Sequence, residues 1–405
     1  MKNISLQDIV KTKEFLNKQI IRTPLTYSSL LSELVDCDVY LKLENLQLTG
    51  AYKVRGALNK ISKLSDEEKA NGIIASSAGN HAQGVALAAK KLGIEATIVM
   101  PETTPLSKII GTKRFGANIV LHGKFYDEAF NHALKIQEEK NLTFIHPFND
   151  PDIIAGQGTV GLEIHEDQSD LDIVVVPIGG GGLISGVAIA LKSLNPNIKI
   201  VGVEAENMPA MKESIKKNKI VKIKKKKTIA DGIAVTQVKD HTFNIVREYV
   251  DEIVTVSESE MAHSIMQLLE IEKVLVEASG AAAFAAIQYN KIKDLKGKKV
   301  GIVITGGNID LNFLDKIIER GFIADGRLFN FSVIVPDAPG MISDVSRIIS
   351  KNKANILDIF HDRFNPNSNL EKTKVRFTIE TKGHEHIEEI IKQIEKKGFT
   401  WEKTL

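Results

Sequence analysis

Four consecutive glycines, Gly179, Gly180, Gly181 and Gly182, followed by Leu183, are the strongest chemical signal in the sequence. They follow the apolar run 173–177 directly and precede a helical stretch at 184–193. Residues without side chains let backbone N–H groups converge on one anion at the start of a helix, and a phosphate suits this arrangement. No Gly-Lys-Ser/Thr follows, and the spacing is not that of the dinucleotide fingerprint, so a nucleotide ligand is disfavoured. The alternative is a turn whose glycines serve only the packing of strand against helix.

A second signal is the stretch 48–57, in which a polar turn leads into a helix that carries Lys53 near its start. The dipole of the helix disfavours a positive charge there, so the amine of Lys53 is easier to deprotonate into a nucleophile. Most lysines are solvated surface residues, and Lys53 taken alone carries little weight.

A third signal is the stretch Ser76 to His81, which ends an apolar run at 72–76 and opens an Ala-rich helix. Small residues with free N–H groups at the start of a helix suit an anion such as a carboxylate. The alternative interpretation is an ordinary helix cap with no ligand.

Apolar runs alternate with helical stretches from about residue 36 to residue 303. This alternation is typical of βαβ units and predicts a doubly wound α/β fold with parallel sheet. Ala-rich, apolar helices at 81–92, 260–270 and 281–289 are expected to pack against sheet. The predicted strands are 39–43, 72–76, 96–100, 118–121, 173–177, 199–203 and 299–304.

The pattern changes near residues 324–327, where a Gly-containing polar joint precedes a second succession of elements. Strands are predicted at 329–335, 354–360 and 374–380, helices at 341–350 and 386–396, and a short apolar stretch ends the chain. This order is βαββαβ, a ferredoxin-like plan. The predicted organisation is therefore a first part at 1–323, a linker at 324–328 and a second part at 329–405.

The composition is that of a globular protein with two or three domains, at 405 residues with 43% hydrophobic and 26% charged. The net charge of +2 provides no field that would attract nucleic acid or anionic lipid. The charge-free segment 173–191 is interrupted by Pro177 and the glycines, so a membrane helix is not expected. One cysteine, Cys37, and charges near the N-terminus predict a cytoplasmic protein without an export signal.

In this order, the three signals resemble the threonine dehydratase family of pyridoxal-phosphate enzymes, which have the fold type II of tryptophan synthase β. The resemblance extends from about residue 5 to residue 320 and implies a small subdomain, at about 45–155, inserted in a larger one. Further stretches that carry it are Arg22–Leu25, Lys42–Gln47, His146–Phe148, Ala155–Thr159, Ile229–Gly232 and Thr305–Asn308.

The resemblance implies that Lys53 bonds pyridoxal 5'-phosphate and later removes the proton from the substrate Cα. Asn80 would donate a hydrogen bond to the phenolic oxygen of the cofactor, and Gly179 to Leu183 would hold its phosphate. Tyr52 stands where relatives usually have Phe, flanking the pyridine ring, and either aromatic ring can stack there.

The resemblance also assigns residues to the substrate and to the ring. Ser77, Ala78 and Gly79, together with Asn80, would line the substrate carboxylate, and Glu277 matches an acidic position near the ring. Thr305 stands where many relatives have Ser facing the pyridine nitrogen. A hydroxyl there does not keep that nitrogen protonated, which favours elimination over transamination or racemisation.

Two departures distinguish the chain from serine racemase, a near relative in this family. The racemase needs a second acid, supplied by a serine just before its Gly-Asn-His, and here that position is Ala78. Its cation site needs two acids, of which Glu204 is present and the second is replaced by Ala210. We therefore expect a dehydratase and no metal.

The tail contains Pro336-Asp337-Ala338-Pro339-Gly340-Met341 and resembles the ACT domain, a module that binds amino acids across paired copies. Asp337, Gly340 and Met341 are the candidate effector site, because free N–H groups at this turn could take a carboxylate. The alternative is a dimerisation domain without ligand. The tail favours feedback control in isoleucine synthesis, with isoleucine or valine as effector.

The expected reaction is the deamination of threonine to 2-oxobutanoate and ammonia, with serine as a second substrate, in a homodimer or homotetramer. The alternatives are a serine or hydroxyaspartate dehydratase, a serine racemase, and a non-catalytic amino-acid sensor. No nucleic acid or membrane partner is expected.

Overall fold

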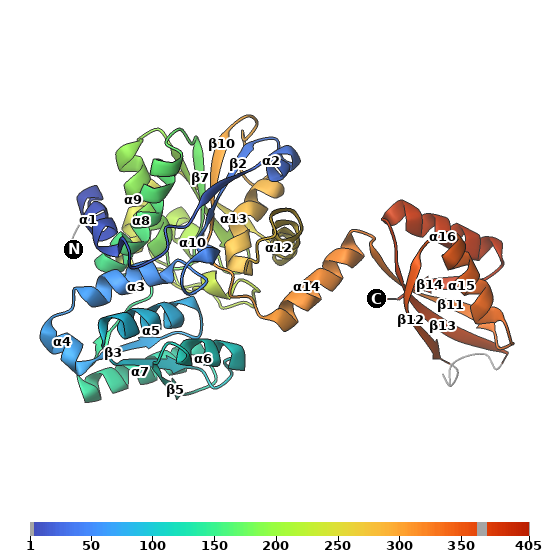
Figure 1. The fold of residues 1–405 in the computed structure, drawn as a ribbon, viewed down its shortest axis with the longest axis horizontal. Coiled ribbons are helices and arrows are strands. Elements are labelled where there is room, and N and C mark those ends of the chain that lie inside the picture. Colours follow the sequence, from blue (N-terminus) through green and yellow to red (C-terminus); the bar gives the residue numbers. More distant parts are fainter. Residues whose placement is uncertain (1–3, 363–370, 405) are drawn as a thin grey trace. The chain divides into compact units, whose positions relative to one another are not determined.

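The computed structural model describes residues 4–362 and 371–404. The chain forms two compact units that divide between Asp310 and Leu311, and each unit is described by itself (Figure 1). The helix α14 (Leu311–Ala324) packs against the first strand of the C-terminal unit and is grouped with it. The compact units thus divide before α14 and not at residues 324–328, where the sequence predicts a linker.

The larger sheet of the N-terminal unit has six strands in the order β1-β2-β10-β7-β8-β9. Only β1 runs antiparallel to its neighbour, and the other neighbours are parallel. Its apolar strand β7 is buried at every residue, as expected for a strand covered on both faces. The strands are β1 (Leu25–Ser28), β2 (Asp38–Leu43), β7 (Ile173–Pro177), β8 (Lys199–Ala205), β9 (Glu252–Val256) and β10 (Lys299–Ile304).

The second sheet interrupts the first in sequence, between β2 and β7. It is parallel throughout, in the order β5-β4-β3-β6, and its strands are β3 (Ile73–Ser76), β4 (Ala96–Met100), β5 (Asn118–Leu121) and β6 (Thr143–Phe144). Alternate residues of β3 serve opposite faces: Ile73 packs in a cluster with α5 (Asn80–Leu92), and Ile74 packs with α7 (Tyr126–Lys140). The N-terminal unit is therefore a doubly wound α/β structure with two sheets, as predicted.

Helices cover the larger sheet, with α13 (Ala278–Gln288) against β7 to β10 and the α8–α9 pair beside them (Figure 1). Gly156, Gly158 and Gly161, whose spacing matches Gly-x-Gly-x-x-Gly, lie inside the buried helix α8 (Pro151–Asp167) and not in a turn between strand and helix, so this spacing is not a nucleotide motif. The other helices of this unit are α1 (Leu6–Leu16), α2 (Ser29–Val35), η1 (Glu44–Leu46), α3 (Lys53–Ser62), α4 (Asp66–Asn71), α6 (Leu106–Lys113), α9 (Gly182–Leu194), α10 (Ala210–Lys216), η2 (Asp231–Ile233), α11 (Asp240–Tyr249) and α12 (Glu258–Glu272).

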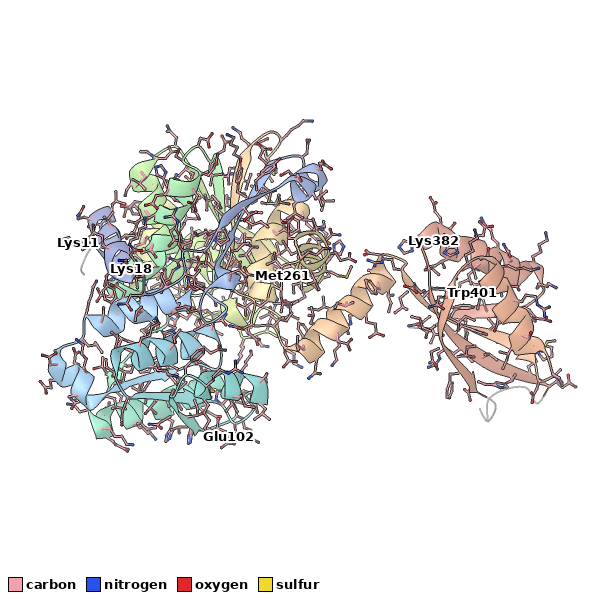
Figure 2. The ribbon with its side chains drawn as sticks, viewed as in Figure 1. Lys11, Lys18, Glu102, Met261, Lys382 and Trp401 are labelled. Atoms are coloured by element: carbon pink, nitrogen blue, oxygen red, sulfur yellow. The ribbon has the colours of Figure 1, made fainter. Side chains whose placement is uncertain are left out.

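The C-terminal unit follows the predicted βαββαβ order. Its antiparallel sheet has the order β12-β13-β11-β14, and Phe331, Phe377 and Ile394 are among the residues of its core. Trp401 packs against this core and its indole donates to Glu395 at 2.8 Å (Figure 2). After α14 the elements are β11 (Leu328–Pro336), α15 (Met341–Lys351), β12 (Asn355–Asp362), β13 (Lys372–Glu380), α16 (His384–Lys396) and β14 (Thr400–Lys403).

Every strand predicted in the N-terminal unit is present, to within one or two residues at its ends. The prediction missed β1, β6 and β9. The strand β1 has only one buried residue, β6 has two residues and β9 alternates in burial, so none of them is a long apolar run. Among the described residues, no helix is both long and apolar enough to cross a membrane.

Candidate functional site

The predicted site residues of the N-terminal unit lie where parallel strands end. The segment 77–79 follows β3, the tetraglycine segment follows β7, and Thr305 follows β10. Lys53 begins α3, shortly after β2 and η1. In open α/β sheets, ligands bind beyond the carboxyl ends of the strands, so the fold gathers these segments at the expected place.

The tetraglycine segment leaves no room for side chains. A Cβ on Gly180 would lie 2.3 Å from the ring of Phe148, and one on Gly182 would lie 3.0 Å from the backbone of Phe148. A Cβ on Gly179 would lie 2.9 Å from the Cα of Ile233. Gly181 has a φ of +90° and caps α9, which L side chains rarely allow. A side chain at any of these positions would thus be strained or would displace a neighbour, and the segment presents bare backbone at the start of a helix.

Lys53 is partly buried at the start of α3, and its amine donates to the carbonyl of Pro147 at 3.2 Å. The amine also lies 5.1 Å from the centre of the Tyr52 ring. Phe148, the neighbour of Pro147, is the residue whose ring covers Gly180. The segment 147–148 therefore joins the lysine to the tetraglycine segment.

Asn80 connects two other predicted residues. Its amide donates to Glu277 Oε1 at 2.7 Å, and its Oδ1 accepts from the amide of Asn308 at 2.8 Å. Asn308 also donates to the carbonyl of Thr49 at 2.7 Å, so the loops before α3 and after β10 are tied to the start of α5. These bonds fix which atom of the Asn80 amide is the donor.

Glu277 lies at the N-cap of α13, and its Oε1 also accepts from Ser279 Oγ at 2.7 Å. Burial raises the pKa of Glu277, although the hydrogen bonds from Ser279 and Asn80 oppose the rise. A Cβ on Gly306 would lie 2.7 Å from Glu277 Oε1, so the chain after β10 passes directly over this carboxyl.

Thr305 is buried, and its carbonyl accepts from the backbone N–H of Tyr52 at 3.3 Å. The next residue, Gly306, forms a β-bridge with Ala51. The segment that carries Tyr52 and Lys53 is therefore held against the end of β10 by its backbone. Thr305, Tyr52, Lys53, Asn80 and Glu277 are all part of one set of contacts.

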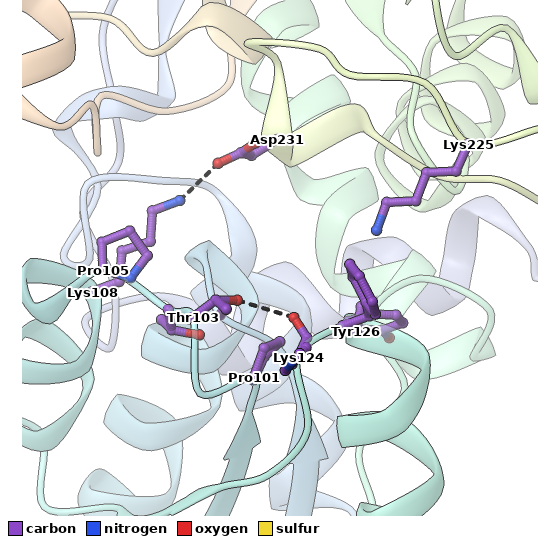
Figure 3. A pocket seen from close by; sticks show the side chains of 11 residues that line it. Pro101, Thr103, Pro105, Lys108, Lys124, Tyr126, Lys225 and Asp231 are labelled. Carbon is purple, nitrogen blue, oxygen red and sulfur yellow. Dashed lines mark hydrogen bonds and ion pairs between the residues drawn. The ribbon is translucent and has the colours of Figure 1, made fainter.

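The predicted carboxylate segment, Ser77 to Gly79, is open on one side. The N–H of Gly79 donates to Ser77 Oγ at 3.2 Å, and nothing lies within 4 Å of the position of a Cβ on Gly79. Ala78 lines a cavity of about 500 Å³. At the rim of this cavity Lys108 forms an ion pair with Asp231 at 2.9 Å (Figure 3). Small molecules therefore have a route to the segment.

Two histidines near Lys53, the buried His81 and the partly buried His146, received no role in the sequence analysis. His81 Nε2 donates to the carbonyl of Ile145 at 2.9 Å, and His146 Nδ1 accepts from the N–H of Asn149 at 2.9 Å. Burial, assisted by the charge of Lys53, lowers the pKa of His81 to about 3. Burial lowers the pKa of His146 to about 4, with smaller effects of Lys239 and Lys53. Both rings are neutral at physiological pH. The only signal in the sequence that could have indicated these two histidines is that they stand in the stretches Ser76 to His81 and His146–Phe148, which carry the family resemblance.

Glu204 is buried, and its two oxygens accept the N–H groups of Met211 and Lys212, at 2.8 Å each. Burial raises the pKa of Glu204 to about 8. Ala210 follows at the start of α10 and offers no ligand atom. Within residues 4–362 and 371–404, no three His, Cys, Asp or Glu side chains are grouped as metal ligands would be.

The predicted effector residues belong to the C-terminal unit. Asp337 and Gly340 are exposed in the turn between β11 and α15, and Gly340 caps α15 with a φ of +94°. Met341 is the first residue of α15 and packs against the core of this unit. The turn thus has the predicted form, and the effector role stays a prediction.

The residues of the N-terminal unit fit pyridoxal phosphate. The tetraglycine segment offers backbone N–H donors and has no side chains beside them. The amine of Lys53 contacts Pro147, and the neighbouring Phe148 covers Gly180. Ser185 Oγ, in the first turns of α9, is buried without a partner among the described residues. A phosphate bound at the start of α9 would occupy the place that this geometry leaves for an anion.

Comparisons with known proteins agree with this arrangement. Residues 16–306 match the model of the pyridoxal-phosphate dependent enzymes, and residues 330–399 match the ACT domain. An L-threonine ammonia-lyase of Thermotoga maritima is 50% identical over 396 residues, 98% of each chain. The structure of the processed form of threonine deaminase isoform 2 from Solanum lycopersicum has a TM-score of 0.75 at 40% identity, over 78% of this chain and 91% of that one. Maize serine racemase has a TM-score of 0.75 at 35% identity, over 80% and 99%. The chain belongs to the threonine ammonia-lyase family of pyridoxal-phosphate enzymes, carbon–nitrogen lyases, and carries a C-terminal ACT domain.

Proposed function

We propose that the chain deaminates L-threonine to 2-oxobutanoate and ammonia, and L-serine as a second substrate. The observation that carries this proposal is that the segment Pro147–Phe148 contacts both Lys53 and the tetraglycine segment. The amine of Lys53 contacts Pro147, and the adjacent ring of Phe148 covers Gly180. The tetraglycine segment would hold the phosphate of the cofactor, and the amine of Lys53 would bond the cofactor.

The side chains divide the work of the elimination. Bound pyridoxal phosphate supplies an electron-withdrawing ring that acidifies the Cα–H bond of the amino acid. Lys53 would take the Cα proton and return it to the β-hydroxyl, which leaves as water. The segment Ser77 to Gly79 would line the substrate carboxylate, with the N–H groups of Ser77 and Gly79 already bonded to the carbonyl of Val99 and to Ser77 Oγ. Thr305 would offer its hydroxyl to the ring nitrogen. The resulting enamine hydrolyses to the 2-oxo acid and ammonia.

Elimination is favoured over racemisation by the residue at position 78. Racemisation needs an acid on the face of Cα opposite the lysine, and the methyl group of Ala78 has no acidic proton to donate. The similarity to serine racemase makes this alternative worth a direct test. Purified protein supplied with pyridoxal phosphate should release 2-oxobutanoate from L-threonine and form no D-serine from L-serine. Release of no 2-oxo acid would refute the proposal, and turnover of hydroxyaspartate or serine above that of threonine would change the substrate.

We further propose that the ACT domain binds a branched amino acid, isoleucine or valine, and regulates the enzyme. The turn Asp337 to Gly340 is exposed and ends in backbone N–H groups at the start of α15. The strand β12, at the edge of its sheet, exposes Leu357 and Phe360, each 54% accessible, which suits pairing with a second copy. A homodimer or homotetramer in the cytoplasm, acting in isoleucine synthesis, is consistent with this arrangement.

The test of regulation is a threonine assay with and without isoleucine and valine. Feedback control predicts that one of them lowers the activity of the full chain and that Asp337→Ala weakens the effect without changing the basal rate. Equal rates at every concentration of both amino acids would leave the domain as a dimerisation module only.

A further inference from the structure

A cluster of four charged side chains lies buried beneath the helix that begins with Lys53. Arg55, Lys42 and Glu44 are wholly buried and Glu163 is 4% accessible. Two positive and two negative charges cancel within the cluster. It lies outside the set of contacts described for the cofactor and substrate, and the proposed reaction does not use it.

Every donor of the Arg55 guanidinium has an acceptor. Nε donates to Glu44 at 2.8 Å, Nη2 donates to Glu44 at 2.7 Å and to Glu163 at 2.9 Å, and Nη1 donates to Glu163 at 2.7 Å and to Thr159 at 3.1 Å. The two carboxylates are thus each held by two nitrogens of one rigid group. Lys42 completes the cluster by donating to Glu163 and to the carbonyl of Thr23, at 2.6 Å each.

The cluster connects four elements that meet around the site. Lys42 and Glu44 come from the end of β2 and from η1, Arg55 comes from α3, and Glu163 comes from α8. Arg55 follows Lys53 by two residues, so the two side chains leave α3 on opposite sides. The guanidinium therefore anchors α3 from behind, while Lys53 faces the cofactor site.

Close backbone contacts prevent the start of α3 from moving independently. A Cβ on Gly84 of α5 would lie 3.1 Å from the backbone of Lys53, and a Cβ on Gly156 of α8 would lie 2.8 Å from the carbonyl of Arg55. The first turn of α3 thus lies between two helices at backbone distance. If Arg55 moved relative to α8, the first turn of α3 would move with it and Lys53 would be displaced.

Stability alone gives no reason for such a cluster. Replacing a buried ion cluster by apolar side chains of similar volume is often neutral or stabilising, because the charges lose their hydration on burial. A planar guanidinium fixes the orientation of the groups that it bonds, and an apolar contact does not. We propose that Arg55 is a positioning residue, which fixes the orientation of α3 and thereby the place of the Lys53 amine relative to the bound cofactor.

The test compares the holoenzyme of Arg55→Lys with that of the unchanged chain. Lysine keeps the charge and loses the two-sided fork. We expect the variant to lose pyridoxal phosphate on dialysis about 10-fold faster, and kcat for threonine to fall about 10-fold with KM within twofold, since a misplacement of about 1 Å costs up to 100-fold. We also expect a shift in the pH midpoint of the visible absorption band of the bound cofactor, because that band reports the proton on the Lys53 nitrogen.

Two further variants separate positioning from stability. Thr159→Val removes one acceptor of the guanidinium at nearly constant volume and should change the same three quantities in the same direction, by less. Asn59→Ala is the matched control, because Asn59 is a buried residue of α3 that bonds the carbonyl of Asp152 at 2.6 Å and has no bond to the cluster. It should lower the melting temperature and leave the cofactor band and its pH midpoint unchanged.

The proposal would be overturned by either of two results. In the first, Arg55→Lys and Thr159→Val lower the melting temperature but keep cofactor loss, kcat and the pH midpoint within twofold of the unchanged chain. In the second, Asn59→Ala shifts the pH midpoint as far as Arg55→Lys does. If Arg55→Lys does not fold, Thr159→Val decides the matter by itself. If the unchanged chain does not turn over threonine, the proposed substrate is refuted and the cofactor measurements remain valid.

Discussion

The amide of Asn80 donates to Glu277 Oε1 at 2.7 Å, across 197 residues of sequence. Asn80 opens the helix after β3, and Glu277 caps the helix that packs against the larger sheet. The bond therefore joins the two sheets of the N-terminal unit at the place where the proposed cofactor ring would lie. This bond raises the question whether the Glu277 carboxyl acts through its charge or as a hydrogen-bond acceptor.

We predict that Glu277→Ala lowers kcat/KM for threonine about 100-fold, because it leaves the Asn80 amide and the Ser279 hydroxyl without an acceptor, at a cost of about 1–3 kcal/mol. Glu277→Gln keeps an acceptor and should retain activity within about fivefold, because burial already favours the uncharged form of the carboxyl. Steady-state kinetics of both variants measures this. A Gln variant as inactive as the Ala variant would mean that the charge itself is needed.

Gly180 provides a second prediction. Gly180→Ala places a Cβ within 2.3 Å of the Phe148 ring, so the ring must move away from the tetraglycine segment. We expect the affinity for pyridoxal phosphate to fall about 10-fold or more, with a loss of stability of about 1–3 kcal/mol from overpacking. Titration of the cofactor by its visible absorbance gives the affinity. Gly111→Ala, whose Cβ would be 3.4 Å from the nearest atom, is the control and should bind the cofactor normally.

Lys53 provides a third prediction. Lys53→Ala should abolish the visible band of a cofactor bonded to the amine and lower threonine turnover at least about 1,000-fold, since Lys53 is the base proposed for the substrate Cα. The fold should persist, because the hydrogen bond from this amine to Pro147 is partly exposed. Lys63→Ala, at the exposed end of the same helix, should keep both the band and the turnover. A band that survives Lys53→Ala would assign the cofactor bond to another residue.

The sequence was sufficient for the parts of the fold that rest on periodicity. The run at 173–177 is apolar at each position, and it is the buried strand β7. The strand β1 could not be found in this way, because it lies at the edge of the sheet and exposes two of its four residues. Residues 311–323 were assigned to the first part of the chain, yet the helix α14 that most of them form packs with the C-terminal unit. No local sequence pattern indicates which unit a helix packs against.

The candidate site was predicted as a set of residues, whose roles stay a prediction, and not as a geometry. The glycines and Lys53 were found from local chemistry combined with a resemblance. That the ring of Phe148 covers Gly180, or that Asn308 bonds both Asn80 and Thr49, depends on contacts between distant segments. Local patterns carry no information on such contacts, because each partner is an ordinary residue in its own segment.

His81 provides a prediction about pH. Its ring is 4% accessible and its pKa falls from 6.5 in the unfolded chain to about 3 in the folded protein. The unfolded state therefore binds a proton first as the pH falls, and stability is fully present above pH 6.5 and is lost progressively down to about pH 3. At pH 5 the loss from this residue is about 2 kcal/mol, at about 1.4 kcal/mol for each pH unit below 6.5. His81→Gln keeps a donor for the carbonyl of Ile145 and removes the titration, so its free energy of unfolding should fall less steeply between pH 6.5 and pH 5. Denaturant unfolding at several pH values measures both slopes, and equal slopes would show that His81 is protonated in the folded protein or accessible to water.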